Sequence, residues 1–128
     1  MAHARASIGT ANYAVSIAAG HHELKADESL KLGGEDTGPA PYELLCSALG
    51  ACTAITLRMY AERKGWPLRA LYVDVRFESK DKEGAIARVL SFEGELNDEQ
   101  RARLADIAER TPVTLTLKQG VVITTTVV

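Results

Sequence analysis

The chain has 128 residues, of which 46% are hydrophobic and 25% charged, and its formal net charge at pH 7 is −2. This length predicts a single domain, residues 1–128, and the composition is that of an ordinary globular protein. The low net charge and the scattered basic residues exclude a nucleic-acid-binding surface. The N-terminus lacks the apolar core of a secretory signal, and the longest charge-free run, 44–57, is too short to span a bilayer. We therefore expect a cytoplasmic protein that needs no membrane.

Small and β-branched residues near the N-terminus predict three strands, at 4–8, 13–17 and 22–26, followed by a glycine-containing loop. Two adjacent histidines, His21 and His22, lie in this region. Adjacent side chains in a strand point to opposite faces, so this pair does not have the arrangement of a metal site. We expect no metal and no cofactor.

A long helix is the most informative element of the sequence. Pro41 suits its first turn, and Gly65 followed by Trp66 suits its C-terminal cap. The intervening segment predicts a helix of roughly 22 residues, about 33 Å long. This segment is apolar on nearly all sides, which is typical of a helix buried on most faces. A chain of this size can hardly cover it, and we therefore expect a second copy to do so.

The second half of the chain alternates and then becomes helical. Apolar and charged residues alternate over 71–78, and the charged segment 80–84 predicts a hairpin tip before a returning strand. The remaining predicted elements are that strand at 85–93, a helix capped by Asn97 and Gln100, a short helix from Thr111-Pro112 to about 119, and a last strand at 121–127. The order βββ-α-ββ-αα-β predicts an α+β fold.

Two cysteines, Cys46 and Cys52, lie six residues apart in the long helix. Helix geometry separates their Cα atoms by roughly 10 Å, whereas a disulfide requires less than about 7 Å. We therefore expect two free thiols in a reducing compartment. Cys52 is surrounded in sequence by small residues, which fits either a core cysteine or a thiol held in a covered site.

Two charged residues of the same helix are candidates for a role beside a thiol. Glu43 lies in the first turn, where the helix dipole favours a carboxylate, but it could also orient a cation or a substrate. Arg58 follows Cys52 by six residues and so leaves the helix from a different face. We expect it to reach solvent or to pair with Glu62, unless it acts across an interface between subunits.

The long helix and its flanks resemble a known family. The resemblance extends over nearly the whole chain, and its motif is specific. The segments that carry it are GPAPYELL at 38–45, ALGACT at 48–53, RMYAERKGW at 58–66 and IAERTPV at 107–113. They are similar to the OsmC/Ohr family of osmotically inducible and organic hydroperoxide resistance proteins, and most closely to its OsmC-like branch.

This resemblance implies an intertwined homodimer in which two long helices pack together and sheets from both chains wrap around them. Enzymatic members are thiol peroxidases, and Cys52 matches their peroxidatic cysteine. Their resolving cysteine corresponds to Thr111 in this sequence, so resolution would require an external thiol. The activating arginine of the hydroperoxide resistance proteins has no counterpart in the turn at 9–12. The position of their catalytic glutamate holds Tyr42, one residue before Glu43 and therefore about 100° away around the helix.

Three readings follow from the residues and the resemblance together. The first is a peroxidase that reduces organic hydroperoxides through Cys52, with Glu43 and Arg58 as supporting charges and an external thiol as reductant. The apolar residues of the helix that we expect to line the site, Leu45, Leu49, Ile55 and Met59, suit an alkyl substrate. The second is a non-catalytic homodimer that binds a small apolar ligand at its interface. The third is a purely structural dimer without a ligand.

Overall fold

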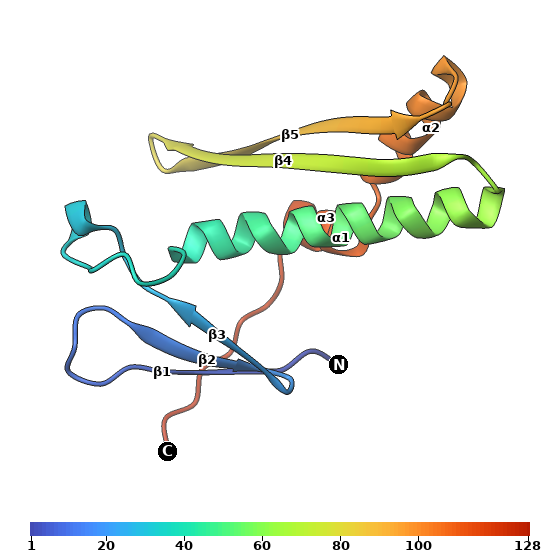
Figure 1. The fold of residues 1–128 in the computed structure, drawn as a ribbon. Coiled ribbons are helices and arrows are strands. Elements are labelled where there is room, and N and C mark those ends of the chain that lie inside the picture. Colours follow the sequence, from blue (N-terminus) through green and yellow to red (C-terminus); the bar gives the residue numbers. More distant parts are fainter. The chain divides into compact units, whose positions relative to one another are not determined.

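The computed structural model describes all 128 residues, and these form two compact units, Met1–Leu45 and Cys46–Val128. Five strands, one short 3₁₀ helix and three α-helices give the predicted α+β composition (Figure 1). The expected organisation as a single domain over residues 1–128 stays a prediction.

The N-terminal unit contains a three-stranded antiparallel sheet in the order β1-β2-β3. Its strands are β1 (Ala4–Ser7), β2 (Val15–Ala19) and β3 (His22–Ala26), and the short 3₁₀ helix η1 (Leu30–Leu32) follows them. The three predicted strands are confirmed, with β2 displaced by two residues toward the C-terminus. The side chains of His21 and His22 do not point to opposite faces as two neighbours in a strand would, because His21 lies in the β2–β3 turn; their ring centroids are 4.2 Å apart and the ring planes are tilted by 35°.

A buried carboxylate organises the loop after β3. Asp27 is 2% exposed and accepts four hydrogen bonds: from the N–H groups of Tyr13, Glu28 and Thr37 at 3.1, 2.7 and 3.1 Å, and from the Thr37 hydroxyl at 2.6 Å. The Thr37 hydroxyl, together with these N–H groups, holds the pKa of Asp27 well below its ordinary value. Gly34 closes the loop so tightly that a Cβ there would overlap the Glu28 carbonyl.

The predicted long helix is α1 (Pro41–Lys64), with 24 residues. Gly65 adopts a φ of +68° just beyond it. The Gly65 and Trp66 N–H groups donate to the carbonyls of Glu62 and Ala61 at 3.1 and 2.9 Å, which is the Schellman arrangement that the sequence predicts. By length and composition alone α1 is able to cross a membrane, but the core helices of soluble proteins pass the same test.

The C-terminal unit continues with a long antiparallel hairpin, β4 (Leu68–Lys80) and β5 (Glu83–Gly94), which is drawn beside α1 in Figure 1. Asp81 and Lys82 form its turn with φ values of +53° and +68°, as a type I′ turn requires. The predicted alternation in β4 is confirmed. The charged positions are exposed, and the half-buried positions are Leu71, Val73, Val75 and Phe77.

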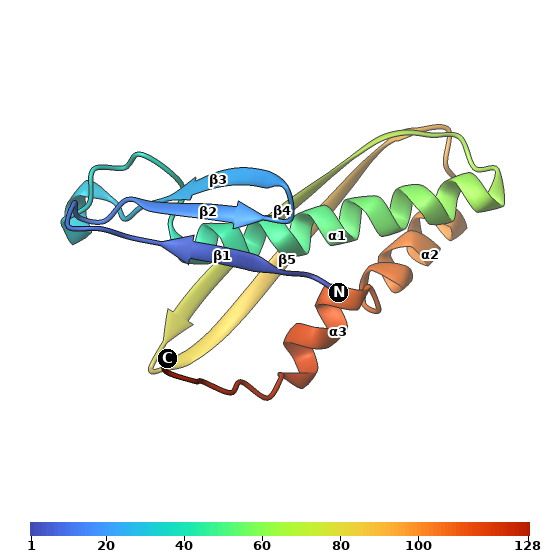
Figure 2. The ribbon, with the colours of Figure 1, turned by 90° about the horizontal axis from the view of Figure 1, so that it is seen from below.

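Two short helices, α2 (Asp98–Ala108) and α3 (Pro112–Gln119), follow the hairpin (Figure 2). Asn97 and Gln100 form the predicted capping box, with N–H to side-chain oxygen distances of 2.8 and 3.0 Å. Thr111 caps α3 by accepting from the N–H of Thr114. These local caps explain why both helices begin where the sequence predicts them.

The core of the C-terminal unit lies between α1 and α2. Leu57, Leu104 and Ala108 are fully buried and contact one another. Partly buried residues from the whole unit surround them: Tyr60, Trp66, Leu71, Leu90, Phe92, Leu96 and Ile107. One stripe of α1 is therefore covered within the unit.

The predicted last strand is absent. Residues 121–127 form no strand in the structure, and all of them are exposed, as the extended tail beyond α3 in Figure 2 illustrates. The segment has a strong β propensity, but a strand also requires a partner for its ladder of hydrogen bonds. Because no strand of the chain pairs with it, propensity alone does not produce the element.

Candidate functional site

The two thiols of α1 are both free and partly exposed. No disulfide joins them, in agreement with the distance that helix geometry predicts. Each thiol is therefore available for chemistry or modification, and their surroundings decide which of them is the better candidate.

Cys52 lies at the edge of an uncovered apolar face of α1. The buried residues of the helix recur every four positions, at Leu49, Thr53, Leu57 and Ala61. Ile55 and Met59, three and seven residues after Cys52, share its side of the helix and are 55% and 57% exposed. We call Cys52, Ile55 and Met59 the thiol face. A thiol beside exposed alkyl groups is a suitable place for an apolar substrate.

Cys46, not Cys52, lines a cleft between α1 and β4. This cleft has a volume of about 460 Å³. Its other lining residues are Ser47, Gly50, Ala51, Val73, Asp74 and Val75. The small side chains of α1 leave this space open, so a cysteine at position 46 is reachable as well, although in a more polar setting than the thiol face.

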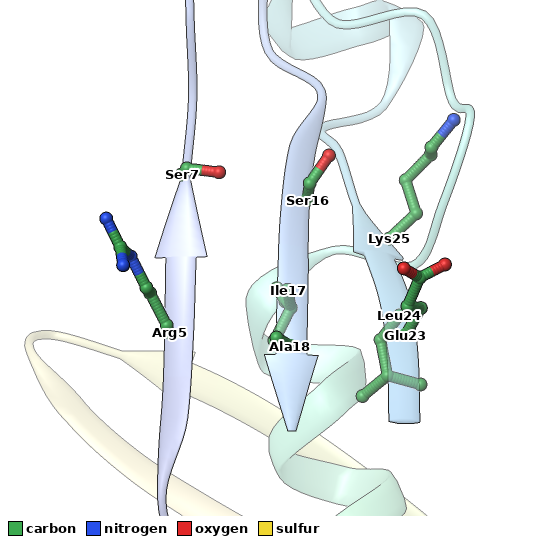
Figure 3. A pocket seen from close by; sticks show the side chains of 8 residues that line it. All are labelled: Arg5, Ser7, Ser16, Ile17, Ala18, Glu23, Leu24 and Lys25. Atoms are coloured by element: carbon green, nitrogen blue, oxygen red, sulfur yellow. The ribbon is translucent and has the colours of Figure 1, made fainter. Parts of the chain in front are cut away.

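A second hollow lies on the sheet of the N-terminal unit and contains no thiol. Figure 3 shows its lining, in which side chains from all three strands take part, and its volume is about 410 Å³. The cross-strand register places Ser7, Ser16 and Lys25 in one row. Its lining mixes charged and hydroxyl side chains with apolar ones, and because it contains no thiol it is not a site for a peroxidatic cysteine.

Glu43 has a structural role at the start of α1. Its Oε1 accepts a hydrogen bond from the N–H of Ala40 at 2.9 Å, which satisfies a donor just before the helix. Nine residues separate it from Cys52, or about 13 Å along a helix axis. Within one chain, the structure does not bring Glu43 to the thiol.

Arg58 also serves the chain itself. Its Nη1 donates to the carbonyl of Leu68 at 2.6 Å and so ties α1 to the start of β4. The predicted pairing with Glu62 was wrong, because this carbonyl lies within reach and no ion pair with Glu62 forms. Cys52 and Arg58 are six residues apart and leave different faces of the helix, so the proposed site residues are distributed along α1 and do not cluster.

Arg88 is a buried charged residue that none of the sequence motifs indicates. Its side chain is 10% exposed, and it donates to Thr53, Thr114, the Ala108 carbonyl and Glu109. A signal was present in the sequence. In β5 the inward positions alternate, and Arg88 occupies one of them among the apolar residues Ile86, Leu90 and Phe92. An arginine in an apolar register predicts a buried polar partner.

Charged residues at the C-terminal cap of α2 and on α3 complete the surroundings of Arg88. The pKa of Glu109 lies below its ordinary value, mainly because Lys118 donates a hydrogen bond to it at 3.2 Å and, to a smaller extent, because Arg88 also does so. Thr111 and Thr53 are completely buried, and Thr114 is 5% exposed. The position that corresponds to a resolving cysteine thus holds a buried, hydrogen-bonded hydroxyl. No group of three or more His, Cys, Asp or Glu residues that could hold a metal is present.

Comparisons with known proteins identify the family. The family model described as OsmC-like protein matches residues 33–126. No curated protein matches the sequence. The fold is similar to that of an OsmC-like protein from Mycoplasma pneumoniae, with a TM-score of 0.80 and 17% identity over 92% of this chain and 87% of that one.

Two further solved structures share the fold. An organic hydroperoxide resistance protein OsmC from Legionella pneumophila has a TM-score of 0.69 and 22% identity, over 92% of this chain and 89% of that one. The organic hydroperoxide resistance protein OhrB of Bacillus subtilis has a TM-score of 0.61 and 21% identity, over 91% and 90%. The family model spans α1, both hairpin strands, α2, α3 and most of the C-terminal tail. Because the match covers most of the chain, the chain belongs to the OsmC-like protein family.

Proposed function

We propose that this protein is a thiol-dependent peroxidase of the peroxide stress response that reduces organic hydroperoxides through Cys52. The observation that carries the proposal is a free, partly exposed thiol on the same side of α1 as the exposed alkyl groups of Ile55 and Met59. Family membership supports it, as do similar folds in proteins named for organic hydroperoxide resistance.

The chemistry needs one sulfur from the chain and two electrons from outside it. The Cys52 thiolate attacks the terminal oxygen of the hydroperoxide, the O–O bond breaks, and the alkoxide leaves as an alcohol after taking a proton. Cys52 becomes a sulfenic acid. An external thiol then condenses with it to a mixed disulfide and water, and a second external thiol releases reduced Cys52 and a disulfide product. Thr111 carries no sulfur and cannot replace these external thiols.

A second copy of the chain is part of the proposal. The thiol face leaves more than half of Ile55 and Met59 exposed in the middle of a long helix, and contiguous apolar exposure of this kind is typical of an interface. A homodimer formed through this face would cover the alkyl groups and enclose Cys52 from one side. Within one chain Glu43 and Arg58 lie away from Cys52, so a supporting role for either of them requires this second copy.

The C-terminal tail also favours a dimer. Val121, Val122, Ile123 and Val127 are 65–93% exposed, and no strand of their own chain pairs with them. The family model includes the tail as far as residue 126, which supports a role for these residues within the domain. We propose that the tail becomes a strand by pairing with a sheet edge of the second copy, which would satisfy its backbone groups.

A non-catalytic dimer that binds a small apolar ligand is the second candidate. The observation that favours it is the full burial of Thr111 in a hydrogen-bonded network, since the hydroxyl at this position cannot act as a second thiol. In this case the thiol face would enclose a ligand without reacting with it.

Turnover of hydroperoxides distinguishes the two functions. Consumption of cumene hydroperoxide and tert-butyl hydroperoxide is measured with a monothiol and with a dithiol donor, for the wild type, Cys52→Ser and Cys46→Ser. The peroxidase proposal expects turnover in the wild type and in Cys46→Ser, and none in Cys52→Ser. Equal rates for Cys52→Ser and the wild type contradict it, and absence of turnover in all three with tight binding of an apolar probe supports the second candidate.

A further inference from the structure

Arg88 joins three helical elements of the C-terminal unit. Its Nη1 donates to the hydroxyls of Thr53 in α1 and Thr114 in α3, at 3.0 and 2.9 Å. Its Nη2 donates to the carbonyl of Ala108, the last residue of α2, at 2.8 Å, and to Oε2 of Glu109 at 3.0 Å. All four Nη hydrogens therefore have acceptors, and the guanidinium also lies at the C-terminus of α2, where a positive charge is favourable.

The hydroxyl groups around Arg88 have fixed directions. Thr53 donates its proton to the carbonyl of Leu49 at 2.7 Å, so its oxygen is free to accept from Arg88. Thr114 accepts from Arg88 and lies 2.6 Å from the Thr111 hydroxyl and 3.3 Å from the Ala108 carbonyl. When Thr111 donates to Thr114 and Thr114 donates to Ala108, every hydroxyl proton has an acceptor. No buried side-chain polar atom lacks a partner.

These bonds act on the turn of α1 that carries Cys52. The apolar contacts of Leu57 with Leu104 and Ala108 hold α1 against α2, but apolar attraction is non-directional and permits small rotations and shifts of a helix. The hydrogen bond from Arg88 to Thr53 is directional and fixes this neighbour of Cys52 relative to β5 and the α2–α3 junction.

We infer that Arg88 is a positioning residue for Cys52: by holding Thr53, it sets the rotation of α1 and thereby the exposure of the thiol. This inference rests on the proposed function, because it assigns a supporting residue to the same thiol. A buried arginine is a costly means of stabilising a core in which apolar residues of similar volume could serve. Directional fixation of α1 accounts for its presence.

The alternative is a purely stabilising role, which would affect unfolding without a selective effect on Cys52. Cys46 provides an internal reference, since it lies on the same helix, is also a free thiol, and stands almost two turns away from Thr53. In a folded variant, the ratio of the two alkylation rates therefore reports the local geometry at Cys52, independently of protein concentration or probe quality.

The test measures the alkylation of both cysteines by iodoacetamide across a pH series, with peptide mass spectrometry to separate the two sites. The variants are Thr53→Val, which removes only the hydroxyl at nearly constant volume, Arg88→Lys and Arg88→Met. Arg76→Met is the matched control, because Arg76 is 77% exposed and pairs only with Asp74. Melting temperatures are recorded in parallel to confirm folding.

The inference expects the Cys52-to-Cys46 rate ratio to change by about 10-fold in Thr53→Val and in Arg88→Met, since misplacement of a reacting group on the order of 1 Å has effects of this size or larger. Arg88→Lys should recover part of the wild-type ratio, and Arg76→Met should leave it unchanged. An unchanged ratio in a folded Thr53→Val variant overturns the inference. The ratio needs no hydroperoxide, so a wild type without peroxidase activity would contradict the proposed function and leave this test valid.

Discussion

Truncation of Ile55 tests whether a second copy covers the thiol face. Full burial of an isoleucine side chain contributes about 1.5–3 kcal/mol, and 55% of Ile55 is still exposed in the single chain. Coverage by a partner is therefore worth about 1 kcal/mol. A two-fold dimer contains the residue twice, which gives about 2 kcal/mol for Ile55→Ala. At 1.4 kcal/mol per factor of ten, the dissociation constant should rise about 20- to 30-fold.

The assay is sedimentation velocity over a dilution series, with molar mass from light scattering as a second readout. Val89→Ala is the matched control, because Val89 is also β-branched, is 63% exposed and lies on β5, away from α1. A wild type that is monomeric at every concentration would refute the coverage of the thiol face by a second copy. An equal change of the dimer dissociation constant in Ile55→Ala and Val89→Ala would refute it as well.

Three further changes have definite expected outcomes. Because the folded-state pKa of Asp27 is depressed, the stabilisation by its carboxylate is present above the unfolded-state value near pH 4 and is lost as the pH falls below it. Asp27→Asn should lower the melting temperature at pH 7 and flatten its decline in acid, and an unchanged acid profile contradicts the stabilising role of the Asp27 carboxylate. Gly34→Ala should lower the melting temperature because its Cβ would lie 2.7 Å from Asp27 Oδ1, whereas Gly9→Ala, with no atom within 4 Å, should be neutral; equal effects would show that the loop is not tightly packed. Thr111→Cys should cause the loss of two thiols per chain after one equivalent of hydroperoxide, as counted with a thiol reagent, and the loss of only one would mean that the new sulfur does not reach the oxidised thiol.

The fold was predictable wherever the signals are local. Pro41 and Gly65 marked the ends of α1, and Asn97 marked the start of α2, because caps depend on hydrogen bonds between residues a few positions apart. The last strand could not be predicted correctly, because the same valine-rich segment is a strand or an extended tail depending on whether another strand lies beside it. The expected dimer and cytoplasmic location stay predictions for a related reason, since both depend on surroundings outside the chain.

The candidate site was only partly predictable from the sequence. Cys52 was found from its place in the motif, and the structure gives it an accessible position on α1. The structural role of Glu43 was predictable in part from its place in the first turn, because its partner is the N–H of Ala40 three residues earlier. The role of Arg58 was not predictable, because its acceptor is a carbonyl at the start of β4. The Arg88 cluster depends on contacts between residues 20 to 35 positions apart, which no local pattern encodes, although the apolar register of β5 pointed to a buried arginine.

The mass of the intact protein after exposure to one equivalent of cumene hydroperoxide, without any reductant, shows directly whether Cys52 is oxidised. Peptide mapping with a sulfenic acid trap then locates the modification. We expect one added oxygen per chain on Cys52, with Cys46 unmodified and with removal of the oxygen by an added thiol. Oxygen found on Cys46 alone, or a protein that the hydroperoxide leaves unchanged, would contradict it.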